Sequence, residues 1–447
     1  MKHTRTVICL AGVLPLLAAA PAIAQEPNPY VRFTFSQGLR LSDNPDLVPD
    51  PPGATLVART GLGFELGAET RVQSLRLTLG TDLEGRFGEA DRDYDFVNDR
   101  ATLAFAREGK NAGLTLTARY ANTPFEDIEI GEETDPDFLV IDAGRRETKS
   151  VALGFDIGRD ARAALDVRLR WSSTDYVDTV DPDLLDSETI GIDTRATFAL
   201  SGALNASLSA GLTETDEEGD VERRTSYLGV GLSGETARGF SFSGSVTYDR
   251  ARTTGGANPK DEDGVGFDLA LTQDRPLGAY TLNLGSRIDE AGRVSRINLG
   301  RAMDLPRGDI SWSVGVTDYD DSDPGLTGSV AWSQETRDGV FSANIVRTQR
   351  PNDAQPYADT RIGLAYRGEL TEISRWGASL DYFSEDQLNG DDDANRTNAS
   401  VTYSRDLTRD WSLSTGYEYT LVDPADGADR DRNSVFLNLQ RDVTFGF

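Results

Sequence analysis

Histidine and cysteine, the side chains most often used for acid–base and nucleophilic chemistry, are almost absent from this chain. The 447 residues contain one histidine, His3, and one cysteine, Cys9. Both lie in the first 24 residues, which have the composition of a leader that is removed after export. The mature chain is therefore predicted to lack a Ser-His-Asp site, a thiolate nucleophile, and any metal held by cysteine or histidine.

Carboxylates are the remaining candidates for catalysis. The chain has 74 acidic residues and 45 lysines and arginines, which gives a formal net charge of −29. Asp82 and Glu84 are spaced so that one strand would place both on the same face, and paired carboxylates can serve as acid and base in glycoside hydrolysis. Such pairs arise by chance in so acidic a chain, and no histidine is present to assist. We therefore expect no enzymatic activity. The acidity also argues against a nucleic-acid partner, which requires clustered lysine and arginine.

The leader itself predicts where the chain is sent. Lys2 and Arg5 precede an apolar run at 7–20, and small residues follow at 22–24. This is the pattern of a secretory signal peptide, so residues 1–24 are predicted to be cleaved and residues 25–447 to form the mature protein. No later apolar run approaches the ~18 residues that a membrane helix needs.

Polar and apolar residues alternate along most of the mature chain. Leu75, Leu77, Leu79 and Leu83 share one face of a predicted strand, and arginines and carboxylates occupy the other face. The same period of two recurs up to the last residue, Phe447. Period two indicates strands, and a single apolar face is what a strand needs when it contacts lipid.

The connections between these strands alternate between short and long. Ten short ones are predicted at 67–71, 108–111, 158–161, 201–203, 234–239, 274–278, 305–309, 336–339, 371–375 and 406–410. Long ones are predicted at 43–54, 88–95, 121–144, 173–188, 213–224, 251–263, 318–324, 350–359, 385–395 and 421–432, with a short connection at 289–293 completing this set. The pattern predicts an all-β fold: a single antiparallel, up-and-down transmembrane β-barrel of about 22 strands (20–24), with short periplasmic turns and long acidic extracellular loops.

Charged residues on the polar faces are predicted to line the lumen of this barrel. An arginine placed in lipid near the midplane would cost about 2–4 kcal/mol, so these residues must point inward. They would either line a water channel or form ion pairs that brace the wall. The predicted lumen-lining residues are Arg76, Asp82, Glu84, Arg86, Arg119, Asp166, Arg168, Arg170, Asp193 and Arg195.

The longest predicted loop, 121–144, is expected to form an acidic outer mouth. Its carboxylates would keep the loop solvated, enrich cations at the entrance, or bind divalent cations weakly against anionic lipid phosphates. None of the acidic clusters matches a calcium-binding loop, so no specific metal site and no cofactor are predicted. Apolar residues such as Phe125 suggest that the loop packs against the barrel wall. The mouth residues are Glu126, Asp127, Glu129, Glu132, Glu133, Asp135 and Asp137.

The end of the first predicted strand, residues 38–45 (GLRLSDNP), resembles the strand-1 opening of the β-barrel porin 2 family. The resemblance lies in Ser42, Asp43 and Asn44. It implies an outer-membrane barrel of the kind associated with exopolysaccharide production and export, and it supplies no catalytic or binding residues. The same residues are also a turn signal at the end of a strand.

Together these features predict a porin-like channel in the cell outer membrane with a cation-favouring mouth, linked through the resemblance to exopolysaccharide export. The alternative is a surface-interaction or structural barrel whose acidic loops bind matrix polymer or divalent cations. Expected partners are outer-membrane lipid, lipopolysaccharide, the barrel-assembly machinery that would recognise the strand ending at Phe447, and exopolysaccharide.

Overall fold

The alternating segments form strands, and the structure, a computed structural model, consists almost entirely of them. It describes residues 29–51, 53–88, 92–125, 144–179, 184–255, 259–320, 323–350, 357–387, 393–424 and 428–446. The leader 1–24, the mouth residues between Glu126 and Asp137, and Phe447 lie outside the described residues. Predictions about them stay predictions.

The described strands number 22. The first eleven are β1 (Tyr30–Ser42), β2 (Thr55–Thr70), β3 (Gln73–Phe87), β4 (Arg92–Glu108), β5 (Ala112–Pro124), β6 (Arg145–Ile157), β7 (Ala163–Val177), β8 (Ser187–Ala199), β9 (Leu204–Glu217), β10 (Val221–Glu235) and β11 (Phe240–Thr254). The others are β12 (Lys260–Arg275), β13 (Gly278–Asp289), β14 (Gly292–Leu305), β15 (Gly308–Tyr319), β16 (Gly325–Glu335), β17 (Gly339–Arg350), β18 (Tyr357–Thr371), β19 (Ser374–Gln387), β20 (Asp393–Asp406), β21 (Trp411–Asp423) and β22 (Arg430–Gly446).

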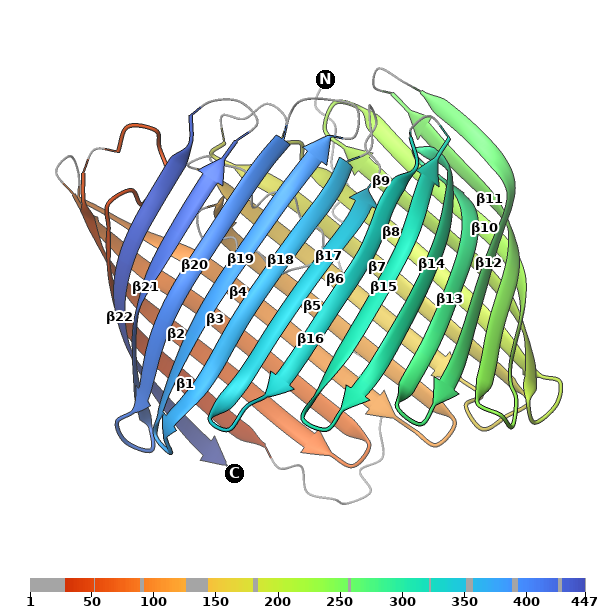
Figure 1. Ribbon diagram of the computed structural model, residues 1–447, viewed down its shortest axis with the longest axis horizontal. Coiled ribbons are helices and arrows are strands. Elements are labelled where there is room, and N and C mark those ends of the chain that lie inside the picture. Colours follow the sequence, from red (N-terminus) through yellow and green to blue (C-terminus); the bar gives the residue numbers. More distant parts are fainter. Residues whose placement is uncertain are drawn as a thin grey trace, which may run out of the picture.

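Each strand pairs antiparallel with the next, and β1 pairs with β22 to close the sheet. The closing register runs from Tyr30 opposite Gly446 to Ser42 opposite Ser434. Closure leaves no unpaired sheet edge, which is how a β-structure satisfies its backbone where water is excluded. The predicted antiparallel 22-strand barrel is therefore confirmed. Figure 1 shows the strands tilted against the barrel axis, with tight turns along the lower edge near the C-terminus.

No helix among the described residues is long and apolar enough to cross a membrane.

The two faces of the strands differ in chemistry. Phe33, Phe64 and Leu79 lie opposite one another across β1, β2 and β3. The large apolar side chains left exposed to the surroundings include Phe33, at 50%, Leu62, at 53%, and Val230, at 58%. A surface of this kind is favourable against hydrocarbon and costly in water. The alternate positions carry arginine, carboxylate, amide and hydroxyl side chains, and we call them the interior face.

The lower turns agree with the predicted short connections, whereas several connections at the other edge are shorter than predicted. The predicted loop 213–224 is a three-residue turn at 218–220, with Glu214, Asp216 and Glu217 inside β9. Likewise, the connection predicted at 251–263 spans only 255–259 in the structure, and the one predicted at 173–188 spans 178–186. These strand ends carry charged residues on both faces, so the hydrophobic alternation that marks a strand is lost there although the backbone ladder continues.

Candidate functional site on the interior face

The ten predicted lumen residues all occupy interior-face positions. In β3, Arg76, Asp82, Glu84 and Arg86 alternate with outward leucines. The other six lie on three further strands, where the register sets Asp166 opposite Arg195 and Arg168 opposite Asp193. Arg119 on β5 is opposite Ser150, and Arg170 on β7 is opposite Ala152. The alternation in the sequence was therefore enough to predict on which face of each strand these residues lie. Whether they line a conducting path stays a prediction.

Around β1 to β4, several interior-face arginines are held in ion pairs. Glu84 is only 3% exposed and accepts hydrogen bonds from Arg59 and from Arg86, whose Nε lies 2.6 Å from Glu84 Oε1. Arg86 also reaches Asp46 on the β1–β2 connection at 2.5 Å. Asp82 accepts a hydrogen bond from Asn98 at 3.3 Å. This network cross-braces neighbouring strands.

On β7 and β8 the pairing is incomplete. Arg170 Nη2 lies 2.6 Å from Asp193 Oδ2, and Arg168 Nε lies 3.2 Å from Asp166 Oδ1. Tyr227 donates a further hydrogen bond to Asp193 at 3.0 Å. Both carboxylates are therefore engaged. Arg119 and Arg195 are exposed and have no ion pair with any residue that the structure describes.

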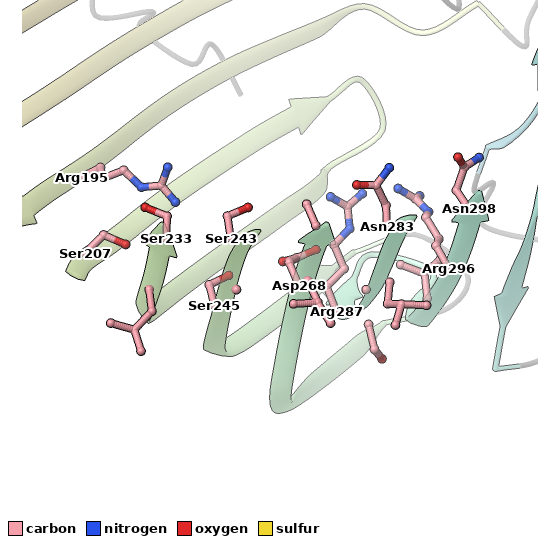
Figure 2. Close-up of a pocket in the computed structure, with 18 of the residues that line it drawn as sticks. Arg195, Ser207, Ser233, Ser243, Ser245, Asp268, Asn283, Arg287, Arg296 and Asn298 are labelled. Carbon is pink, nitrogen blue, oxygen red and sulfur yellow. The ribbon is translucent and has the colours of Figure 1, made fainter. Parts of the chain in front are cut away.

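A hollow of about 530 Å³ lies beside Arg195, along the wall from β8 to β14. We call it the β8–β14 hollow. In Figure 2, Arg195 lies at one end of the row of labelled side chains, Arg296 and Asn298 lie at the other, and serines lie between them. The labelled lining residues are Arg195, Ser207, Ser233, Ser243, Ser245, Asp268, Asn283, Arg287, Arg296 and Asn298.

The β13–β14 hairpin bends inward above this hollow. Strand β12 pairs with β13 only as far as Phe267 opposite Ser286. Beyond that point, the backbone N–H of Ile288 donates instead to Asp249 Oδ2 on β11, at 3.3 Å. The tip continues toward β10, where Glu290 lies 4.0 Å from Arg223. The hairpin thus covers the interior face of β11 and β12 and narrows the barrel on that side.

The β1–β2 connection also folds over the interior face. Asn44, 4% exposed, donates to the carbonyl oxygens of Val48 and Asp431 at 2.8 and 2.9 Å. Leu47 is 3% exposed, and Arg432 donates to the carbonyl of Pro45 at 3.3 Å. Asn44 belongs to the segment that carries the family resemblance, and here it acts as the anchor of an inward-folded loop.

Of the predicted mouth segment 121–144, the structure describes residues 121–125 and 144, and residues 121–124 belong to β5. Phe125 follows directly after that strand. It is 1% exposed and stacks on Tyr176 of β7 with ring centroids 6.2 Å apart. This contact agrees with packing of the segment against the wall. The seven predicted mouth carboxylates lie beyond Phe125, outside the described residues.

Four lining residues of the hollow, Asn283, Arg287, Arg296 and Asn298, were not among the predicted site residues. The alternation of polar and apolar residues could have identified them, because each lies on the polar side of its strand. This pattern was harder to interpret near residues 289–293, because the connection predicted there is short whereas the other connections of its set are long. No group of three or more acidic, histidine or cysteine side chains among the described residues could hold a metal ion.

No protein-family model and no curated protein matches the chain, so the resemblance of residues 38–45 stays a prediction. Solved structures do match. A mutant of the ferric enterobactin receptor PfeA from Pseudomonas aeruginosa has a TM-score of 0.59 at 10% identity, over 94% of this chain and 81% of that one. The siderophore receptor PirA from Acinetobacter baumannii has a TM-score of 0.59 at 10% identity, over 95% and 81%. The FrpB iron transporter from Neisseria meningitidis reaches 0.61 at 9% identity, over 94% and 83%. At these identities the similarity concerns the fold, and the chain shares the β-barrel architecture of these receptors and transporters.

Proposed function

We propose that the chain is an outer-membrane channel for hydrophilic solutes. One observation carries the proposal: a closed barrel exposes apolar side chains on its outer face and arginines, serines and asparagines on its interior face, beside a hollow of about 530 Å³. Such a wall suits a water-filled path, because every ion and hydroxyl group on it can stay hydrated.

Location in the outer membrane is part of this proposal. It is supported by the predicted leader 1–24, by the apolar outer face, and by the fold shared with receptors of this architecture. The link to exopolysaccharide export rests on residues 38–45 alone and is proposed on that basis.

Planar-bilayer recording of the refolded full chain tests the channel. The expected result is a steady, stepwise conductance from protein that migrates faster on gels before boiling than after it. A refolded, heat-modifiable barrel that never raises the current above that of the lipid alone would refute the proposal. It would then favour the surface-interaction reading, which tight binding to matrix polymer would support.

A further inference from the structure

The floor of the β8–β14 hollow is made of small side chains. Across the sheet, Gly231 lies between Ser207 and Ser245, and Ser245 lies opposite Asp268. A Cβ added at Gly231 would come within 2.8 Å of the Ser207 hydroxyl and 3.0 Å of the Gly244 carbonyl oxygen. The side chains along this row are therefore small from β9 to β11, and longer ones lie on β8 and from β12 onward.

Each end of the floor carries guanidinium groups. Arg195 stands on β8, and Arg287 and Arg296 stand on β13 and β14. Adjacent strands are about 4.8 Å apart, so the five strand steps from β8 to β13 separate the two ends by about 24 Å. The hollow is thus an elongated groove in the wall with positive charge at both ends.

These arginines are available to a ligand, unlike those around Glu84. Arg195 and Arg296 have no ion pair with any residue in the described part of the chain, and Arg296 hydrogen-bonds only to a neutral group, the Tyr319 hydroxyl. Arg287 has one long pair, 3.8 Å to Asp289. All three side chains are exposed to the interior. The carboxylates nearest to them are shared or distant: Asp166, opposite Arg195, pairs with Arg168, and Asp289 lies 3.8 Å from Arg287. The three guanidinium groups therefore retain capacity for charge-assisted hydrogen bonds.

The remaining lining defines the chemistry of the ligand more closely. Serine hydroxyls and the amides of Asn283 and Asn298 can donate to and accept from hydroxyl groups. No aromatic ring of a described residue lines the hollow, so these residues offer no stacking surface. Asp268 projects into the same groove and would repel a densely charged anion such as a polyphosphate, although it can accept a hydrogen bond from a hydroxyl group.

We propose that the β8–β14 hollow binds an extended, hydroxyl-rich solute that carries carboxylate groups at intervals, of which an acidic oligosaccharide is the simplest kind. Arg195 holds one carboxylate, and Arg287 with Arg296 holds another. Hydroxyl groups between them contact the serine floor and Asp268. This inference rests on the proposed channel only for its route of access, since the binding site is part of the wall itself.

The test is block of single-channel current by three probes: a short oligogalacturonate, a neutral maltooligosaccharide of equal length, and inorganic phosphate. We expect interruptions of the current by oligogalacturonate at concentrations where the other two have no effect. In the double variant R195Q/R296Q, the blocking concentration should rise about tenfold or more, since charge-assisted contacts are lost at both ends of the groove. Ser245→Phe should also weaken block, because it fills the floor without changing any charge.

Arg375→Gln is the matched control. Arg375 is an interior-face arginine on β19, whose contact with Asp406 is long, at 3.7 Å, and it lies outside the lining of the hollow. This variant removes a lumen charge and should leave block unchanged. Heat-modifiable migration of every variant on gels confirms that it has folded.

Equal block by the neutral sugar, or block that survives R195Q/R296Q, would overturn the inference while leaving the channel in place. Block by phosphate at the same concentrations would reduce the site to a general anion site and would also overturn it. If no conductance is seen at all, the channel proposal fails. Calorimetric titration of the detergent-solubilised chain with oligogalacturonate then decides the inference: saturable binding that R195Q/R296Q abolishes supports it, and no binding rejects it.

Discussion

At the scale of single residues, solvent exposure distinguishes the charged side chains that stabilise the wall from those that remain accessible in the lumen. Glu84 is 3% exposed and accepts from two arginines, whereas Asp166 and Arg168 are 43% and 69% exposed in their side chains. A buried ion pair is costly to break, because removing one partner leaves the other as an uncompensated charge away from water. The same alternating pattern therefore produces braces in one part of the wall and exposed charges in another.

We predict that Glu84→Gln lowers the free energy of unfolding by about 2 kcal/mol, since Arg59 and Arg86 lose their shared carboxylate but stay partly hydrated. Urea titration of the refolded protein in lipid vesicles, followed by tryptophan fluorescence, measures this. Arg168→Gln is the comparison, and because its pair with Asp166 is exposed it should change stability by less than about 1 kcal/mol. Equal effects of the two variants would contradict the assignment of Glu84 as a brace.

Glycine in the lower turns gives a second prediction at this scale. Gly278 has φ +116°, and a Cβ there would collide with the carbonyl oxygen of Ala302. At Gly202, in another lower turn, an added Cβ would have nothing within 4 Å. We expect Gly278→Ala to cost about 1–3 kcal/mol and Gly202→Ala to be neutral or slightly stabilising. The two variants are compared by their refolding yield into vesicles and by their urea midpoints. If Gly278→Ala leaves the stability unchanged, the turn adjusts without strain.

At the scale of strands and hairpins, the alternation of apolar residues was enough to predict the number and direction of the strands. Sequential strands joined by short turns pair antiparallel, which the sequence predicted. The register, including that of β1 with β22 at the two ends of the chain, was not predicted from the sequence. Strand ends were predicted less well. Glu214 and Asp216 read as loop because the part of β9 that carries them is polar on both faces, although backbone hydrogen bonding continues.

Contacts between non-adjacent strands could not be predicted from the sequence. Asp249 accepts from the N–H of Ile288 only because the β13–β14 hairpin leaves the ladder with β12, and nothing local to either residue signals this. The β8–β14 hollow likewise collects Arg195 and Arg296 from positions about a hundred residues apart in the sequence. Alternation predicts which way each points, but the shape of the wall decides which of them share a groove.

The inward hairpin leads to a third prediction. Asp249→Ala removes the acceptor for the Ile288 N–H, so the β13–β14 tip should detach more often and the open-channel current should become larger and noisier. Single-channel recording at fixed voltage measures both. Asp381→Ala serves as the control, because it removes an interior-face carboxylate on β19 without a described contact to the hairpin. Identical traces for the two variants would indicate that the hairpin does not limit the current.

At the scale of the whole molecule, charge is arranged along the barrel axis. The interior-face positions beside the lower turns are acidic on many strands, including Glu69, Glu108, Asp156, Glu235, Asp274 and Asp304. The predicted outer mouth is acidic as well, whereas the wall between carries the available arginines. A permeating ion would therefore meet negative rims and a wall with positive patches.

This arrangement predicts an ion selectivity that depends on salt concentration. The net charge of −29 acts over long distances, and the Debye length of about 10 Å at 0.1 M salt lets the rims dominate, so cations should be preferred. At 1 M salt the Debye length falls to about 3 Å, so an ion senses only the groups it passes closely, and the exposed Arg195, Arg287 and Arg296 should shift the preference toward anions. Reversal potentials under matched KCl gradients at low and high mean salt measure this shift. It should be smaller in R195Q/R296Q than in the unmodified chain or in R375Q. A cation preference that stays constant from low to high salt would mean that ions do not pass near the arginine-bearing wall.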